Sequence, residues 1–217
     1  MKKGVLVCFF GIDGSGKTTL AKSLIEDLKT NKIESKYLWW LEAENSIFRR
    51  FLRFIFPNTE KNKEIDNTKV LKIFKKFPLL SLTYQYLVIF DHLIQAIFKI
   101  RIPLILGKNI ICDRYIYDVI ISFSIEFEYS KNKFKNILNN FYNLFPKPNL
   151  AFLIDIPEEI ALKRKDDSPS INHLKTERVI YTDLAKKYRM IILDGSKDLT
   201  KLKSKILNKV LKFLKKK

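Results

Sequence analysis

A glycine-rich motif near the N-terminus constrains the fold of this chain more than any other part of its sequence. The motif spans Gly11–Thr18 and consists of a glycine, four further residues, and then Gly-Lys-Thr. The apolar run Val5–Phe10, typical of a buried strand, precedes it, and the helical pattern Lys17–Leu28 follows it. A glycine-rich turn between a strand and a helix is the setting of a P-loop, which binds phosphate groups. The sequence therefore predicts an ATP-dependent kinase of the P-loop type.

Each residue type in the motif has a physical role in holding a nucleotide. The glycines let backbone N–H groups converge on the β-phosphate at the positive end of the helix dipole. Lys17, expected to face solvent in the empty loop, can reach the β- and γ-oxygens, and the Thr18 hydroxyl can ligate Mg²⁺. Asp13 is expected to project towards the acceptor or to bond its own loop backbone. The predicted ATP-binding residues are Gly11, Ile12, Asp13, Gly14, Ser15, Gly16, Lys17, Thr18 and Thr19.

Apolar runs and helical patterns alternate along the rest of the chain, which is typical of a parallel sheet covered by helices on both faces. Neither an internal repeat nor a linker divides the sequence, so residues 1–217 are predicted to form a single domain. The predicted strands are Val5–Phe10, Tyr37–Leu41, Ile110–Cys112, Leu150–Ile154 and Met190–Leu193. The predicted helices are Lys17–Leu28, Leu79–Phe98, Pro157–Lys165, Lys175–Lys187 and Leu199–Leu214, the last with an apolar face that can dock on the sheet or anchor to a membrane.

A second candidate site, Asp113-Arg114-Tyr115, follows the apolar run Asn109–Cys112. Ligands of an open parallel sheet bind beyond the carboxyl ends of its strands, so this site should lie near the P-loop. Asp113 would then face the Mg²⁺, and Arg114 would face an incoming phosphate, because its planar fork of donors suits two oxygens. Alternatively, Asp113 caps the next helix and Arg114 lies on the surface.

A basic segment, Lys163–Ser170, follows the strand and helix that begin at Leu150. Its Ser168-Pro169 step should interrupt the helix. The segment is predicted to be a lid, about residues 163–172, that closes over the nucleotide. A solvated helix end, whose cations interact favourably with the helix dipole, is the alternative interpretation.

The 217 residues include 41 Lys and Arg against 23 Asp and Glu, a net charge of +18. This charge would suit a nucleic acid, an anionic membrane or a polyphosphate ligand, and a compositional bias towards lysine explains it equally well. In Phe48–Phe54, Arg and Phe are interleaved. These side chains could stack on bases or form an amphipathic helix with its aromatic face inward.

Two cysteines, Cys8 and Cys112, lie in apolar runs typical of buried strands. They are expected to be free, buried thiols, which fits a reducing cytoplasm. The segment Tyr84–Leu106 is apolar enough to raise the question of a membrane span, but it contains Asp91, Lys99 and other polar residues. A buried helix is the prediction for this segment.

Three segments in this order resemble the thymidylate kinase family: Phe10–Thr19, Ile111–Tyr115 and Leu153–Arg164. The stretch Ile192–Ser196 is also similar to the segment on the adenine side in that family. The resemblance implies an α/β fold of three α/β/α layers, with a five-stranded parallel sheet and a small lid. It further implies transfer of the γ-phosphoryl group of MgATP to dTMP, giving dTDP and ADP. Members often form homodimers through helices, and Leu79–Phe98 could serve for this.

The resemblance and the motifs together assign roles to individual residues. The predicted catalytic residues are Lys17, Asp113, Arg114 and Arg164, the last because the family's lid supplies a stabilising cation when the P-loop carries no arginine. The predicted metal ligands are Thr18 and Asp113, and the predicted acceptor-binding residues are Asp13, His92, Arg114 and Tyr115.

The acceptor side departs from the family pattern at several positions. Trp39–Asn45 stands where the family usually has Arg-Glu-Pro-Gly, and Val88 stands where a phenylalanine stacks on thymine. His92 replaces an arginine that binds the acceptor phosphate, and Asp118 replaces a serine. A histidine there is charged only if a neighbour such as Asp91 raises its pKa. Another nucleotide, a nucleoside or a phosphorylated sugar therefore remains an alternative acceptor, and a nucleotide-dependent protein that binds nucleic acid or membrane remains an alternative function.

Overall fold

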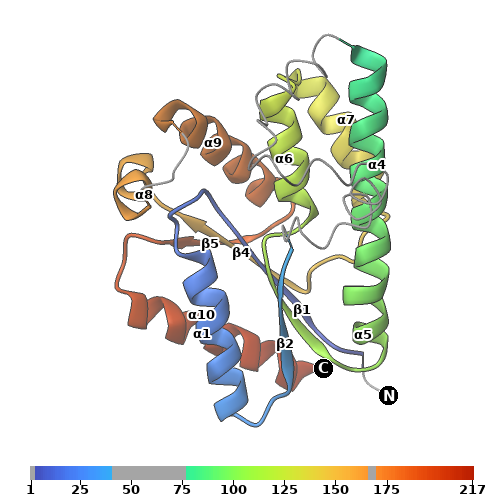
Figure 1. The fold of residues 1–217 in the computed structure, drawn as a ribbon. Coiled ribbons are helices and arrows are strands. Elements are labelled where there is room, and N and C mark those ends of the chain that lie inside the picture. Colours follow the sequence, from blue (N-terminus) through green and yellow to red (C-terminus); the bar gives the residue numbers. More distant parts are fainter. Residues whose placement is uncertain (1–2, 41–76, 166–169) are drawn as a thin grey trace, which may run out of the picture.

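The computed structural model describes residues 3–40, 77–165 and 170–217. In these residues, five parallel strands form one sheet in the order β2-β3-β1-β4-β5 (Figure 1). The prediction of an α/β fold with a five-stranded parallel sheet is confirmed. The strands are β1 (Leu6–Phe10), β2 (Ser35–Trp39), β3 (Asn109–Asp113), β4 (Leu150–Asp155) and β5 (Ile191–Asp194).

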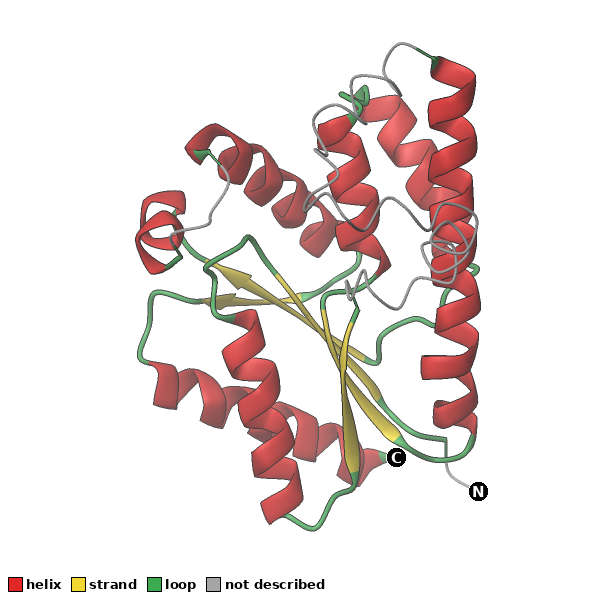
Figure 2. Ribbon diagram, in the orientation of Figure 1, coloured by secondary structure: helices red, strands yellow, loops and turns green. Residues whose placement is uncertain are grey.

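Helices cover both faces of the sheet, which gives the expected three layers (Figure 2). One face carries α1 (Lys17–Thr30) and α10 (Leu199–Lys216). The other carries α4 (Pro78–Ala96), the π-helical η3 (Ile97–Arg101), α5 (Ile102–Ile105), α6 (Ile116–Glu126), α7 (Lys131–Tyr142) and α9 (Ile171–Lys187). The short α8 (Glu158–Arg164) follows β4 and lies at the end of the sheet, beside the loop after β1.

The central strand β1 explains why both faces need helices. All five of its residues are buried. Leu6, Cys8 and Phe10 join the core beneath α4, α6 and α9, whereas Val7 and Phe9 join the core beneath α1 and α10. Successive side chains of a strand point to opposite faces, so an entirely apolar strand requires a hydrophobic layer on each side.

The C-terminal helix α10 packs on the sheet through an apolar stripe. Leu202, Ile206 and Val210 are buried in the core on the α1 side. At its end, Lys217 Nζ donates hydrogen bonds to the carbonyl oxygens of Lys3 and Gly4, both at 2.6 Å. The sequence allowed this helix either to dock on the sheet or to anchor to a membrane, and in the structure it docks on the sheet.

Three sequence predictions need correction. The segment Tyr84–Leu106 is helical but not buried, because Phe90 and Phe98 of its outer face are 59% and 65% exposed. Helices α6 and α7 are additional to the predicted helices; α6 is buried over most of its length, so its sequence lacks the polar face that marks a surface helix. Helix α9 begins at Ile171, four residues before the predicted start, where Ser170 Oγ accepts from the His173 N–H at 3.3 Å.

The sheet register places two loops side by side. Phe9 of β1 pairs with Asp113 of β3, and the Arg114 N–H donates to the Phe9 carbonyl at 3.1 Å. The loop after β1 and the turn after β3 therefore lie next to each other at the carboxyl edge of the sheet, as expected for a ligand site in this class of fold. In the part of the chain that the structure describes, no helix combines the length and apolarity that a membrane crossing requires.

Candidate active site

The loop between β1 and α1 has the backbone of an anion-binding turn. Gly14 and Gly16 adopt φ of +78° and +90°, which side chains disfavour. A Cβ atom at Gly14 would also lie 2.3 Å from the Ala161 carbonyl oxygen of α8. No side chain caps the N-terminus of α1, and the buried Ser15 Oγ has no hydrogen-bond partner. Free donors at a helix N-terminus favour a bound phosphate.

Lys17 lies inside this loop. Its side chain is 5% exposed, and its Nζ donates to the Ile12 carbonyl at 3.0 Å and to Asp13 Oδ1 at 3.3 Å. The expectation that Lys17 faces solvent in the empty loop is wrong, because the carbonyl and the carboxylate already solvate its charge. Burial lowers the pKa of Lys17, and the negative charges of Asp118 and Asp113 oppose this effect.

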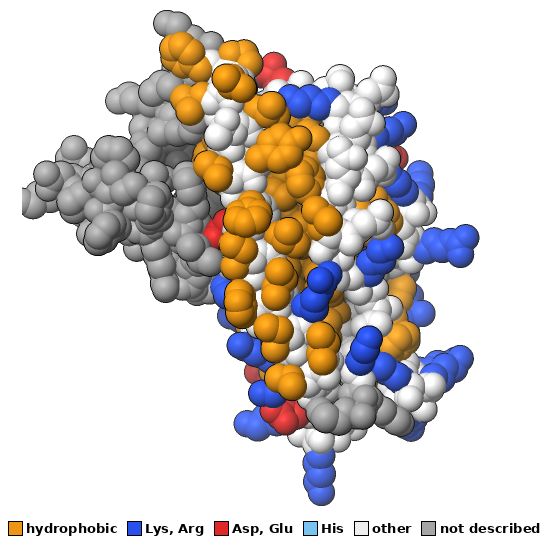
Figure 3. Space-filling view, turned by 90° about the vertical axis from the view of Figure 1, so that its right-hand side faces the viewer, with side chains coloured by type: hydrophobic (Ala, Val, Ile, Leu, Met, Phe, Trp, Pro, Cys, Tyr) orange, Lys and Arg blue, Asp and Glu red, His pale blue; other side chains and the backbone are white. Residues whose placement is uncertain are grey.

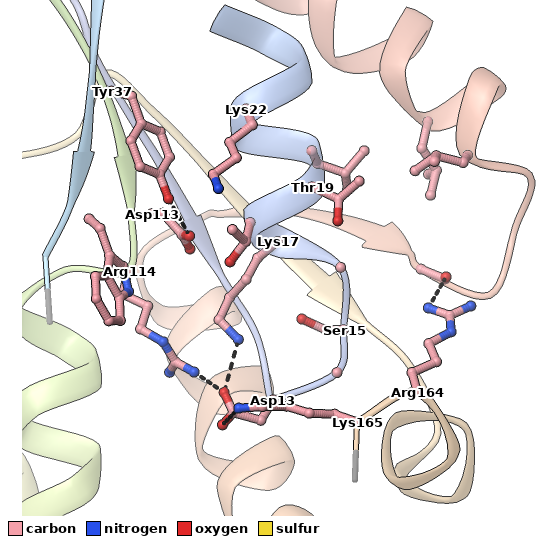
Figure 4. Close-up of a pocket in the computed structure, with 18 of the residues that line it drawn as sticks. Asp13, Ser15, Lys17, Thr19, Lys22, Tyr37, Asp113, Arg114, Arg164 and Lys165 are labelled. Carbon is pink, nitrogen blue, oxygen red and sulfur yellow. Dashed lines mark hydrogen bonds and ion pairs between the residues drawn. The ribbon is translucent and has the colours of Figure 1, made fainter. Parts of the chain in front are cut away.

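Asp13 is the centre of a cluster of cations (Figure 4). Its carboxylate receives Lys17 from α1, the guanidinium of Arg114 from the turn after β3, and Lys165 Nζ at 3.1 Å from the end of α8. Three elements that are far apart in the sequence thus direct positive charge to one point at the mouth of the loop. An anion at this point would be held from three sides.

Asp113 is fully buried at the end of β3, next to the P-loop. One of its oxygens accepts a hydrogen bond from the Tyr37 hydroxyl of β2 at 2.9 Å, and the other has no partner (Figure 4). A buried carboxylate oxygen without a partner is costly unless a ligand completes it. Asp113 does not cap the following helix, so the alternative interpretation of this residue is excluded.

The unpartnered oxygen of Asp113 and the hydroxyl of Thr18 fit the predicted Mg²⁺ ion. Mg²⁺ prefers oxygen ligands and in nucleotide sites takes one or two from the protein, with phosphate and water completing its shell. Asp113 Oδ1 and the hydroxyl of Thr18 supply donors of this kind. Elsewhere in the described residues, no group of three or more His, Cys, Asp or Glu side chains could hold a metal.

Arg114 occupies a strained backbone position at the start of the acceptor side. Its φ is +66°, which is uncommon for a residue with a side chain. One terminal nitrogen contacts Asp13 and the other lies 3.2 Å from Asp118 Oδ1. Burial alone would lower the pKa of Arg114, but Asp118 and other nearby groups raise it overall, so the guanidinium stays charged.

Tyr115 does not face the site. Its ring is 1% exposed among Trp40, Tyr117 and Phe145, and its hydroxyl donates to the Pro146 carbonyl at 2.9 Å. The predicted role of Tyr115 in binding an acceptor therefore finds no support. The residue instead starts α6, where its N–H donates to Asp118 Oδ2 at 2.8 Å.

His92 lies against the indole of Trp40, with ring centroids 5.4 Å apart. Its Nδ1 is buried and has no hydrogen-bond partner. Burial lowers the pKa of His92 to about 4, and Asp91 compensates only in part. The expectation that Asp91 could keep this histidine charged is therefore wrong, and at neutral pH His92 offers a neutral ring.

The predicted lid is described on both sides of residues 166–169. Arg164 ends α8 and donates to the Gly195 carbonyl after β5 at 3.3 Å, on the side expected to hold adenine (Figure 4). The neighbouring Lys165 reaches Asp13 instead. The stretch Phe48–Phe54 lies outside the described residues.

A cavity of about 1170 Å³ joins these parts. It extends from Leu199 and Leu202 of α10, past the glycine-rich loop, to Tyr37 and Trp39 of β2. The carboxylates in its wall are Asp13 and Asp113, and the cations are Lys17, Lys22, Lys36, Lys99, Arg114, Arg164, Lys165 and Lys197. Such a long, strongly positive cavity suits a polyphosphate ligand.

Sequence reasoning missed four side chains that support the site: Tyr37, Asp118, Glu177 and Tyr181. In the sequence, Asp118 is distinguished only as a departure from a family pattern. Asp118 follows Arg114 by four residues at the start of a helix, and this spacing indicates that the two side chains are neighbours. The same spacing indicates that Glu177 and Tyr181 are neighbours on α9. Neither spacing indicates that the two pairs meet, which Tyr181 and Asp118 do through a hydrogen bond of 2.6 Å.

Glu177 is a buried carboxyl group beside the cations of the site. Burial raises its pKa to about 7, while Arg114 and Lys17 lower it and Asp118 raises it. A carboxyl group whose pKa is higher in the folded than in the unfolded state binds its proton more tightly when folded. The free energy of unfolding therefore falls as the pH rises from about 4.5 to about 7.

We expect Glu177→Gln to remove this dependence. Relative to the variant, the wild-type protein should lose on the order of 3 kcal/mol between pH 4.5 and pH 8, from a pKa shift of about two and a half units. Urea denaturation of both proteins at several pH values measures the difference. Parallel curves would mean that Glu177 titrates as it does in the unfolded chain.

Comparisons with known proteins agree with the geometry of the site. The family model described as thymidylate kinase matches residues 9–206. The chain is 27% identical over 220 residues to a protein named "Probable thymidylate kinase" from Methanocaldococcus jannaschii, covering 99% of this chain and 98% of the relative. It is 27% identical over 212 residues to the thymidylate kinase of Ligilactobacillus salivarius (92% and 94% covered) and 26% over 187 residues to that of Plasmodium falciparum (83% and 75%).

The family match includes the glycine-rich loop, the turn after β3 and the strand before the lid. A phosphate-binding loop and a second cation site beyond a neighbouring strand are what transfer between two phosphates requires. The resemblance inferred from the sequence is thus confirmed over most of the chain. This chain belongs to the thymidylate kinase family, whose members are ATP-dependent nucleoside monophosphate kinases.

Proposed function

We propose that this protein transfers the γ-phosphoryl group of ATP to dTMP, giving dTDP and ADP. The observation that carries the proposal is the convergence of Lys17, Arg114 and Lys165 on the carboxylate of Asp13. These cations come from the nucleotide loop, the acceptor side and the lid. They therefore surround the place where negative charge from both substrates would meet.

In the reaction, an oxygen of the acceptor phosphate forms a bond to the γ-phosphorus. The bond from that phosphorus to the β–γ bridging oxygen breaks, and ADP leaves with the electron pair. The protein forms no covalent bond, so its task is to align the reactants and to neutralise charge. Lys17 and the N–H groups at the start of α1 hold the β- and γ-phosphates of the donor.

Mg²⁺ bound with ATP neutralises the charge on the β- and γ-phosphates. Thr18 and Asp113 would hold it, and the hydrogen bond from Tyr37 fixes the second oxygen of Asp113. On the acceptor side, Arg114 would bind the phosphate of dTMP, and Asp13 would contact its sugar. His92 can add one neutral hydrogen bond through its unpartnered Nδ1.

We further propose that residues 1–217 form one domain in which residues 163–172 act as a lid. Closure would bring Arg164 from the Gly195 carbonyl to the transferred phosphoryl group. A single hydrogen bond of 3.3 Å on an exposed side chain is a weak restraint on this movement.

For this reason, Arg164→Ala should lower kcat by about tenfold or more while the KM for ATP changes little, because the contact forms with charge that develops in the transition state. Steady-state kinetics measure both constants, with Lys163→Ala as the control for loss of a neighbouring charge. A higher KM for ATP at unchanged kcat would instead assign Arg164 to the adenine side.

A homodimer through α4 is also proposed. Hydrophobic side chains form an exposed stripe over this helix (Figure 3). In a dimer that pairs through helices, a second copy of the chain would cover this stripe. The exposed members on α4 include Leu79, Leu82, Tyr86 and Phe90, from 41% to 79% exposed. Patches of this kind mark interaction sites. Light scattering of the purified protein distinguishes the dimer from the 25.7 kDa monomer.

The free, buried Cys8 and Cys112 fit a cytoplasmic location.

A panel of acceptors tests the proposed reaction. ADP release is measured with ATP, Mg²⁺ and each of dTMP, dUMP, dCMP, dGMP, thymidine and a sugar phosphate. We expect dTMP to be used most efficiently. If dTMP gave no turnover at millimolar concentration while another acceptor did, the protein would remain a P-loop kinase but with a different acceptor.

A further inference from the structure

Arg114 is held between two carboxylates that come from different elements. Asp13 belongs to the P-loop, and Asp118 belongs to the first turn of α6. Each carboxylate contacts one terminal nitrogen of the guanidinium. Since Arg114 is proposed to bind the acceptor phosphate, the arriving negative charge competes with these two carboxylates for the guanidinium.

The two carboxylates are anchored very differently. The Asp118 side chain is 1% exposed, and that of Asp13 is 23% exposed. Besides Arg114, Asp118 accepts the Tyr115 N–H at 2.8 Å and the Tyr181 hydroxyl at 2.6 Å. The further partners of Asp13 are Lys17 and Lys165, which a phosphate can take over. No such replacement exists for the backbone N–H and the buried hydroxyl that Asp118 satisfies.

These two donors fix Asp118 in the core, so it cannot follow Arg114, and opening their contact would leave a buried carboxylate without its cation, which is costly. Opening the contact to Asp13 is cheaper, since its carboxylate is partly in water and an arriving phosphate replaces its negative charge. The guanidinium therefore keeps one fixed partner and has one exchangeable partner.

From these contacts, we infer that Asp118, supported by Tyr181, is the positioning residue that orients Arg114 towards the acceptor phosphate, while Asp13 occupies the other nitrogen until the acceptor replaces it. The inference rests on the proposed role of Arg114. It adds a residue from α6 and one from α9 to the acceptor site, so that three elements outside the P-loop determine where the phosphate binds.

Asp118→Asn tests the inference, because it keeps the shape and removes the charge. Binding of dTMP, measured by calorimetry in the absence of turnover, should weaken by about tenfold or more, while binding of ATP changes less than about twofold. Tyr181→Phe should weaken dTMP binding in the same direction but by less. Asp183→Asn, an exposed residue of α9, is the matched control for loss of one negative charge.

Asp118→Ser serves as the second variant, should Asp118→Asn not fold. Equal loss of dTMP and ATP binding, or a change in melting temperature with unchanged dTMP binding, would overturn the inference. Failure of the wild-type protein to bind dTMP would overturn the proposed acceptor instead. With the P-loop filled by ATP, the same variants are then compared with inorganic phosphate, which can use the acceptor site but carries no base, and unchanged phosphate binding in Asp118→Asn would also reject the positioning role.

Discussion

Replacing Lys17 by alanine should lower turnover by about 10² to 10³-fold, which is the usual effect of losing one charged contact to a transferred phosphoryl group. The variant should still fold, because Arg114 and Lys165 continue to balance the charge of Asp13. Steady-state turnover at saturating ATP and dTMP measures the loss of activity, and circular dichroism tests whether the variant folds.

The position of Lys17 adds a consequence for stability. Its ammonium group is buried and donates to the Ile12 carbonyl, so its removal takes one of the two donors of that carbonyl, the other being the Ser15 N–H. A loss of about 1 kcal/mol in the free energy of unfolding is expected. Lys29→Ala, an exposed lysine in the last turn of the same helix and outside the lining of the cavity, is the control. If Lys17→Ala retained more than about a tenth of wild-type turnover, the assigned role of the loop would be wrong.

Replacing Arg114 by alanine should lower kcat/KM for dTMP by about 10- to 150-fold, because a charge-assisted contact to a phosphate contributes on the order of 1.5 to 3 kcal/mol. The KM for ATP should change little, since the donor is bound mainly by the P-loop. The loss of this cation also leaves Asp118 and Glu177 without their neighbour, which should raise the pKa of Glu177 further. Initial rates with dTMP varied at saturating ATP measure the effect.

Arg114→Lys separates charge from geometry. Lysine retains the charge but not the planar fork that contacts Asp13 and Asp118 at the same time. We expect this variant to recover only a small part of the activity lost in Arg114→Ala. Full recovery would mean that a point charge is sufficient and that the two carboxylates do not orient the side chain. An equal effect on the KM values of both substrates would place Arg114 at the donor.

The nucleotide side could be predicted from the sequence because its information is local. The glycines, Lys17 and Thr18 lie within one turn of chain between an apolar strand and a helix, so backbone geometry alone brings them together. The neighbouring position of Asp113 also followed, because carboxyl ends of adjacent parallel strands share one edge of the sheet. Both predictions depend on spacing along the chain and on the hydrophobic period, which tertiary packing does not change.

The acceptor side could not be predicted to the same extent, because its properties depend on which elements pack together. His92 is neutral because the fold buries it against Trp40, and Tyr115 is unavailable because its hydroxyl meets the Pro146 carbonyl. Desolvation and hydrogen-bond partners set these states, and neither can be read from spacing.

The sequence by itself determined the fold class, the family and the loop that holds the nucleotide, since each of these follows from local patterns of glycine, charge and apolar residues. Only the tertiary structure decided the charge environment of Arg114. Asp118 from α6 and Glu177 and Tyr181 from α9 meet there although Asp118 and Tyr181 are 63 residues apart in the sequence. Electrostatic effects depend on distance in space and on burial, and the packing of α9 against α6 is what brings these groups together.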